Sequence, residues 1–165
     1  MTLLNKNKIL SYLFVFTFGL ISSFSLPPYN LFYINFISYP VLLWTLLFYS
    51  KNKIVSFNIG WIFGFGYFIS NLYWITNSLT FEDIFKPLIP FALILIPLFL
   101  GLFYGLSTLV FSFLNPQKNF LSILILATTI SIFEYIRSFL FGGFPWNLIA
   151  FSFVNYLEFI QILSI

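Results

Sequence analysis

Two ionisable side chains near the end of an apolar stretch are the clearest candidates for chemistry in this sequence. Glu134 and Arg137 are three residues apart, so a helix would present both on one side, where they can pair. Ionisable groups at the end of a membrane span are costly and are functional candidates for that reason. An ordinary ion pair within reach of interfacial water is the alternative, and the spacing favours neither interpretation.

A segment that breaks helices follows this pair. It consists of Gly142, Gly143, Phe144, Pro145 and Trp146. Irregular backbone near membrane depth is tolerated only where protein or a wet cavity covers it. We therefore group these five residues with Glu134 and Arg137 as one candidate site, with an ordinary loop after an interfacial ion pair as the alternative.

The composition excludes several other kinds of site. The 165 residues contain no Cys and no His. Disulfides, thiol nucleophiles, histidine bases and zinc sites of the usual kind are therefore absent from this sequence. We predict no metal site and no cofactor. The seven Lys and Arg residues form no run, so we also predict no nucleic-acid partner.

The elements that must position the candidate site are membrane helices. Hydrophobic residues make up 61% of the chain and charged residues only 7%, whereas soluble domains carry about 25% charged residues. A helix needs about 20 mostly apolar residues to cross a bilayer. Such runs occupy residues 9–26, 31–49, 54–79, 88–114 and 120–136, and a sixth apolar run at 148–165 carries Glu158. We predict an all-α polytopic bundle of five complete transmembrane helices plus a partial sixth.

The basic residues predict an orientation for this bundle. With a cytoplasmic N-terminus, five of them lie on the inner side and two on the outer side. The inner set is Lys6, Lys8, Lys51, Lys53 and Lys118, and the outer set is Lys86 and Arg137. Because inner loops are enriched in Lys and Arg, we predict a multi-pass inner-membrane protein with residues 142–146 on the outer face.

Two glycine pairs predict close helix packing. Gly60 and Gly64 are four residues apart, as are Gly101 and Gly105, so each pair lies on one helix face. Small residues at this spacing let a neighbouring backbone approach closely. We interpret them as packing residues. A second polar cluster contains Asn71 and Asn77 beside aromatic residues, and it fits either an aromatic belt at the interface or a cavity wall.

The sequence around the candidate site resembles that of a known protein family. Residues 133–137, which read Phe-Glu-Tyr-Ile-Arg, followed by Gly-Phe-Pro-Trp at 143–146, resemble the membrane part of bacterial apolipoprotein N-acyltransferases. Weaker support comes from Leu-Pro-Pro-Tyr at 26–29, Gly-Trp-Ile-Phe-Gly-Phe-Gly at 60–66 and Tyr-Trp at 73–74. The resemblance covers essentially the whole chain.

This resemblance implies an inner-membrane enzyme with a helical bundle and a periplasmic nitrilase-like domain. Such an enzyme moves an acyl chain from a phospholipid to the N-terminal diacylglyceryl-cysteine of a lipoprotein. Its Glu, Lys and Cys belong to the nitrilase-like domain and cannot be assigned here, because the chain has no Cys. Glu134 matches a membrane motif and not the catalytic base. We therefore expect no catalytic residue in residues 1–165 and no activity of this chain alone.

The same resemblance implies a role and partners for the chain. It would hold lipid tails and place the active-site domain over the outer leaflet, with Glu134, Arg137 and residues 142–146 at the junction. Its partners would be membrane phospholipid, diacylglyceryl lipoproteins through the missing domain, and a separately encoded nitrilase-like domain. We expect residues 1–165 to be an N-terminal transmembrane domain from a truncated, split or decayed gene.

Two other classes of function remain as alternatives. A small membrane transporter subunit would need polar groups at mid-membrane and repeated halves, and the sequence offers neither. A non-catalytic membrane assembly protein would use its glycine faces to bind partners, and nothing in the sequence excludes that.

Overall fold

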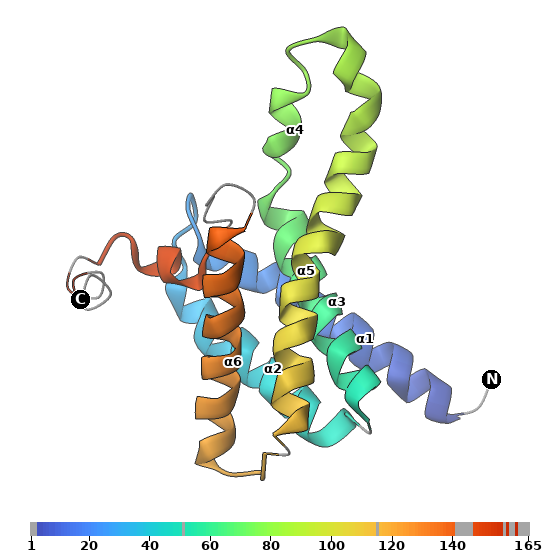
Figure 1. Cartoon of the computed structure of the whole chain (residues 1–165), viewed down its shortest axis with the longest axis vertical. Helices are drawn as coiled ribbons and strands as arrows, with labels where there is room; N and C mark the ends of the chain where they lie inside the picture. Colours follow the sequence, from blue (N-terminus) through green and yellow to red (C-terminus); the bar gives the residue numbers. More distant parts are fainter. Residues whose placement is uncertain are drawn as a thin grey trace.

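The computed structural model is a bundle of helices joined by turns (Figure 1). The structure describes residues 3–50, 52–114, 116–140, 147–156, 158 and 161, with side chains from residue 9 onward. Within these residues there are no strands. The α-helices are α1 (Leu3–Ser22), α2 (Asn35–Tyr49), α3 (Lys53–Asn71), α4 (Ile75–Ser78), α5 (Ile89–Phe113) and α6 (Phe120–Phe139). Three short 3-10 helices lie between them, namely η1 (Ser23–Ser25), η2 (Phe32–Ile34) and η3 (Asp83–Leu88), and a fourth, η4 (Ile149–Phe153), follows α6.

Three helical stretches in the described residues are long and apolar enough to cross a membrane. They are Phe32–Tyr49, Asp83–Phe113 and Phe120–Phe139. The apolar part of the first helix, Ile9–Ser25, is shorter. The predicted all-α membrane character is therefore confirmed. The predicted number of five complete spans stays a prediction.

The structure differs from two of the predicted apolar runs. The span predicted at 54–79 ends as an α-helix at Asn71, and the four-residue α4 follows after a turn. Beyond the turn, hydroxyl groups bond to their own backbone, as in the 2.6 Å bond from Ser78 Oγ to the Ile75 carbonyl. Such local bonds compete with a continuous helix.

The second correction concerns the run at 148–165. It begins with the 3-10 helix η4 and a turn rather than with a membrane-spanning α-helix. Leu148, which precedes η4, has an extended backbone (φ −70°, ψ 146°). The backbone of Ile149 is hydrogen-bonded to another helix, as described below. Most residues after 156 lie outside the described part of the chain.

The bundle is built around α3, which packs most extensively on α5 and next on α1. All four predicted packing glycines lie in the interface between α3 and α5. A Cβ atom added to Gly64 would lie 2.9 Å from the Cα of Gly101, and one added to Gly60 would lie 2.5 Å from the Tyr104 carbonyl oxygen. Gly105 faces the ring of Phe57. At Gly60 and Gly64 the opposing backbone atoms leave no room for a larger side chain.

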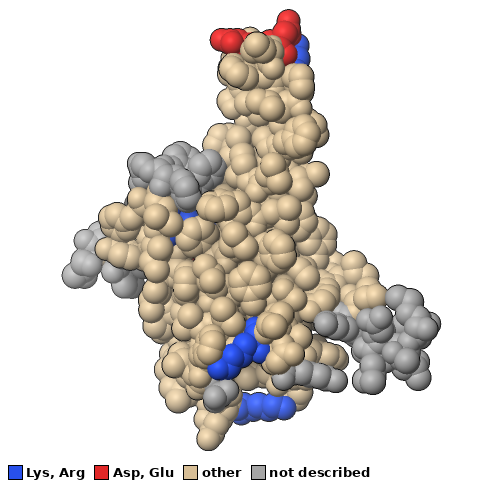
Figure 2. Space-filling view, turned by 45° about the vertical axis from the view of Figure 1, so that its right-hand side comes forward, with Lys and Arg blue, Asp and Glu red and all other residues tan. Residues whose placement is uncertain are grey.

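Charged side chains gather at the two ends of the bundle. At one end, α4, η3 and the start of α5 form a hairpin that stands clear of the other helices (Figure 1), and its tip carries the Lys86–Asp83 ion pair of 2.5 Å. Figure 2 shows acidic atoms at this tip and only basic ones at the opposite end of that face. There, Lys53 lies over the ring of Phe113 and Lys118 over that of Phe48.

Candidate functional site

The helix α6 places Glu134 and Arg137 side by side, as their spacing predicts. Arg137 Nη2 donates to Glu134 Oε1 at 3.3 Å. The Arg137 side chain is 0% exposed and the Glu134 side chain 15%. The guanidinium carbon lies 4.8 Å from the centroid of the Phe68 ring of α3, within the range of a cation–π interaction. The pair is therefore enclosed by protein rather than exposed at a helix end.

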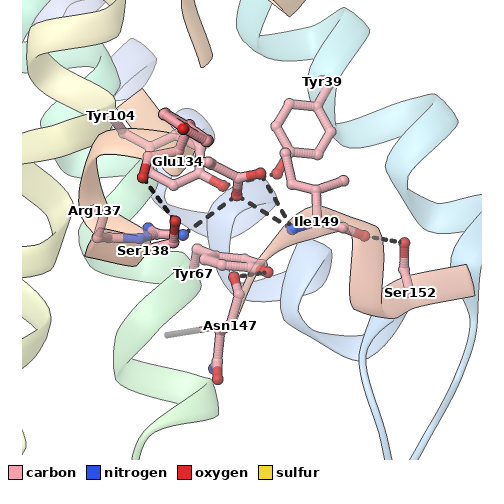
Figure 3. Close-up of polar contacts among 10 residues, drawn as sticks. Tyr39, Tyr67, Tyr104, Glu134, Arg137, Ser138, Asn147, Ile149 and Ser152 are labelled. Carbon is pink, nitrogen blue, oxygen red and sulfur yellow. Dashed lines mark hydrogen bonds and ion pairs between the residues drawn. The ribbon is translucent and has the colours of Figure 1, made fainter. Parts of the chain in front are cut away.

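Glu134 also binds the chain that follows the helix. The backbone N–H of Ile149 donates to this carboxylate, with distances of 3.2 Å to Oε1 and 3.4 Å to Oε2 (Figure 3). Both carboxylate oxygens are thus engaged. A charged acceptor strengthens each of these bonds relative to a neutral one. Glu134 consequently fixes the position of η4 relative to α6.

Two further hydrogen bonds hold the same stretch of chain. Tyr67 of α3 donates its hydroxyl to the carbonyl of Asn147 at 3.0 Å. Asn35 of α2 donates its amide to the hydroxyl of Ser152 at 3.1 Å, and this contact is buried. We call residues 147–152 the tethered segment, because side chains from α2, α3 and α6 each bind it. Figure 3 shows the bonds that Tyr67 and Glu134 make.

The backbone of the tethered segment begins in a conformation that its first residue favours. Asn147 has a φ of 42°, and Asn enters the left-handed region more readily than most residues because its short side chain can bond locally. Ser152 Oγ closes a local bond to the Ile149 carbonyl at 2.6 Å. The segment is thus shaped locally and anchored from outside.

Tyrosine rings surround the carboxylate of Glu134. Tyr39 and Tyr104 share a hydrogen bond of 2.9 Å between their hydroxyl groups. The ring of Tyr67 lies 5.8 Å from that of Tyr104. Figure 3 shows these rings beside Glu134, contributed by α2, α3 and α5. The site is therefore a polar core between four helices, and not a single helix terminus.

Some donors in this core have no acceptor in the described residues. Arg137 uses Nη2, whereas its Nε and Nη1 atoms have no hydrogen-bond partner there. The remaining site residues predicted from sequence are Gly142, Gly143, Phe144, Pro145 and Trp146, and they lie outside the described part. Their flanking residues are described. Leu140 ends α6 through a 3.3 Å bond from its N–H to the Ile136 carbonyl, and Asn147 opens the tethered segment.

Two hollows adjoin this core. One, of about 430 Å³, is lined by Asn71, Trp74 and Asn147 together with the turn at Pro27 and Pro28. Asn71 thus lines a cavity, whereas Asn77 is exposed on α4. The other is an apolar groove of about 630 Å³ between α2 and α6, with Glu134 and Ile149 among its lining residues.

Comparison with known proteins identifies the family. Residues 18–165 match the sequence profile described as the apolipoprotein N-acyltransferase N-terminal domain. The chain belongs to the apolipoprotein N-acyltransferase family. It is 37% identical over 146 residues to the apolipoprotein N-acyltransferase of Sinorhizobium fredii and 34% identical over 146 residues to that of Brucella suis. The enzyme of Rhizobium meliloti is 36% identical over 146 residues.

The match covers only part of the length of these apolipoprotein N-acyltransferases. In each of the three comparisons the alignment covers 83% of this chain and 27% of the relative. The chain therefore spans about a quarter of the length of the curated relatives it matches. The Glu134–Arg137 core and the tethered segment both lie inside the matched residues.

Local sequence patterns point to only part of this core. Spacing on a helix pairs Glu134 with Arg137. Tyr67, Asn147, Asn35 and Ser152 were missed, because their bonds join residues 80 and 117 positions apart. The only sequence feature that these residues share is a polar group inside an apolar run. Such a group can also serve ordinary helix packing or local hydrogen bonding, so it does not by itself indicate a site.

Proposed function

We propose that this chain serves as the membrane-embedded part of an apolipoprotein N-acyltransferase, with its core positioning residues 142–146 beside the reacting lipid. The observation that carries the proposal is the bond from the Ile149 N–H to the buried Glu134 carboxylate. Together with α6, this bond holds the chain on both sides of residues 142–146.

Positioning is the role that fits the chemistry of Glu134. Its carboxylate accepts hydrogen bonds from Arg137 and from the Ile149 backbone. A general base needs an oxygen within reach of the proton that it abstracts, and these oxygens are already engaged. Positioning of reactants lowers barriers substantially, and a displacement of about 1 Å can cost about a hundredfold in rate. Glu134 and Arg137 are accordingly assigned as positioning residues.

The reaction implied by the family is acyl transfer from a phospholipid to the amino group of a diacylglyceryl-cysteine. Covalent catalysis through a thioester would divide that transfer into two easier steps. These 165 residues contain no Cys, so we place the thiol in a separate nitrilase-like domain. Co-expression of this chain with such a domain is expected to give N-acylation. Failure with a well-folded pair would contradict the proposal.

The proposed location is the bacterial inner membrane, with the N-terminus in the cytoplasm. Support comes from the charge distribution at the ends of the bundle. Lys53 and Lys118 lie where α3 and α6 begin, and the Lys86–Asp83 pair lies at the hairpin tip. Excess basic residues are expected on the cytoplasmic side, which would leave the hairpin tip outside.

A chimera tests the proposed function directly. The matching N-terminal quarter of the Sinorhizobium fredii enzyme would be replaced by this chain and expressed in cells depleted of their own enzyme. Mass spectrometry of a lipoprotein N-terminus would then report the third acyl chain. We expect triacylated lipoprotein. Diacylated product alone, from a chimera that inserts and folds, would contradict the proposal.

A further inference from the structure

The apolar groove between α2 and α6 has the dimensions of one bilayer leaflet. It runs along α6 from Ile123 to Glu134, about 16 Å at 1.5 Å per residue. Half of a hydrocarbon core of about 30 Å is about 15 Å. Its walls include Pro40, Leu43 and Leu47 from α2 and Ala127 and Ile130 from α6. The groove could therefore take one extended acyl chain.

One end of the groove is closed by η4. Ile149 and Phe153 line the groove at this end. Ile149 is bonded to Glu134 of α6, and Ser152 of the same short helix is bonded to Asn35 of α2. The helix η4 thus bridges the two walls. A transmembrane helix lying in the groove would collide with this bridge before it crossed the bilayer, whereas a lipid tail can end there.

The other end of the groove carries an unneutralised positive charge. Phe48 lines the groove, and the Lys118 ammonium lies 3.9 Å from the centroid of the Phe48 ring. Lys118 is exposed, and within the described residues the ion pairs are Lys86–Asp83 and Arg137–Glu134. The acidic residues of those pairs lie toward the opposite end of the bundle. Lys118 is thus available to an anion at the headgroup level.

From this geometry we propose that the groove binds one acyl chain of an anionic phospholipid, drawn from the leaflet at the Lys118 end. The Lys118 ammonium contacts the lipid phosphate, and the tail runs between α2 and α6 until it meets η4. This site adjoins the core formed by Tyr67, Arg137 and the tethered segment, and it shares Glu134 and Ile149 with that core. It does not depend on the proposed acyl transfer.

Native mass spectrometry of the 165-residue chain tests the proposal. The protein is reconstituted with equal amounts of phosphatidylglycerol and phosphatidylcholine that carry the same acyl chains, and is then released from the bilayer. One retained phosphatidylglycerol is expected. Lys118→Gln is expected to lower its retention about fivefold, the effect of one basic residue near an anionic surface. Lys53→Gln is the matched control, because Lys53 also lies over a Phe ring at this end, but that ring, Phe113, does not line the groove.

A second pair of variants tests the groove itself. Ala127→Trp fills the groove and is expected to abolish retention of phosphatidylglycerol, whereas Leu124→Trp places the same bulk on an exposed position of α6 outside it. Equal loss of phosphatidylglycerol retention in Lys53→Gln and Lys118→Gln would overturn the proposal, because it would indicate a general attraction of anionic lipid to the basic surface. Unchanged retention in a folded Ala127→Trp protein would overturn it too, as would a cross-linked dimer joined through the groove.

Discussion

Glu134 is the residue on which the core depends most. It offsets the charge of a fully buried Arg137 and accepts the Ile149 N–H. Removing one partner of a buried ion pair leaves an uncompensated charge and costs about 3–5 kcal/mol. An amide at the same place can still accept both hydrogen bonds. The carboxylate and the amide therefore differ in charge more than in shape.

This difference gives a stability prediction. Glu134→Leu is expected to lower the free energy of unfolding by about 3–5 kcal/mol, and Glu134→Gln by about 1–3 kcal/mol, because acceptors of buried hydrogen bonds are kept. Unfolding by a denaturing detergent in bicelles would measure both. Glu82→Gln at the exposed hairpin tip serves as the control and should leave the unfolding curve unchanged. A Glu134→Gln protein as stable as the parent would argue against a buried charge pair.

The bond between Asn35 and Ser152 gives a second prediction at this scale. Asn35→Ala and Ser152→Ala each remove one side of the same contact. A double-mutant cycle should therefore show a coupling energy of about 0.5–1 kcal/mol, in the range of hydrogen bonds between membrane helices. Asn35 and the exposed Ser78 provide a control cycle. Strict additivity of Asn35→Ala and Ser152→Ala would show that the tether contributes nothing.

Sequence spacing predicts the Glu134–Arg137 pair because both residues lie on one helical turn. It cannot predict the bond from Tyr67 to Asn147, whose partners are 80 positions apart and are brought together by the whole bundle. Nor does it predict that the pair is enclosed by protein. Burial of Arg137 depends on Phe68 of α3, which belongs to a different span.

At the scale of the elements, the interface between α3 and α5 determines how closely the helices approach. Gly60 and Gly64 face backbone atoms of α5 and side-chain atoms close to that backbone. Gly105 faces only the ring of Phe57. A ring at the end of a side chain can move away, but a carbonyl group within a helix cannot. The four glycines are therefore not equivalent.

Substitution by alanine should reveal this difference. Gly60→Ala is expected to destabilise the protein by about 1–3 kcal/mol through overpacking, since its Cβ would lie 2.5 Å from the Tyr104 carbonyl oxygen. Gly105→Ala should lower the free energy of unfolding by clearly less than Gly60→Ala. Unfolding curves of both variants in the same bicelles would compare them. Equal loss at both positions would contradict the packing described here.

Helix boundaries were predictable where the chain offers clear signals. The polar residues before Phe120 predict the start of α6 correctly. The end of α3 was misjudged because Tyr73 and Trp74 continue the apolar pattern after the helix has turned at Leu72. The 3-10 conformation of Ile149–Phe153 was not predicted, because it depends on bonds to Glu134 and Asn35, which lie in other elements.

At the scale of the whole molecule, the positions of the hairpin and of Lys118 at opposite ends of the bundle predict the membrane topology. Ser78 lies on α4 in the protruding hairpin, and Asn119 precedes α6 at the end that carries Lys118. Because the chain has no Cys, Ser78→Cys and Asn119→Cys each give a single thiol. An impermeant thiol reagent added to intact cells should label the first and not the second. Equal labelling from one side would rule out this topology.

The central claim is that the buried Glu134 positions residues 142–146 for acyl transfer. Its most direct test is the kcat of lipoprotein N-acylation by the chimera, measured per folded molecule for Glu134→Gln and for Glu82→Gln. Glu134→Gln replaces charge-assisted bonds by weaker neutral ones, and a displacement of about 1 Å can cost about a hundredfold in rate. We therefore expect kcat to fall by about tenfold or more for Glu134→Gln, with KM little changed. Glu82→Gln should retain the parental kcat. Equal kcat values for the two variants would contradict the account.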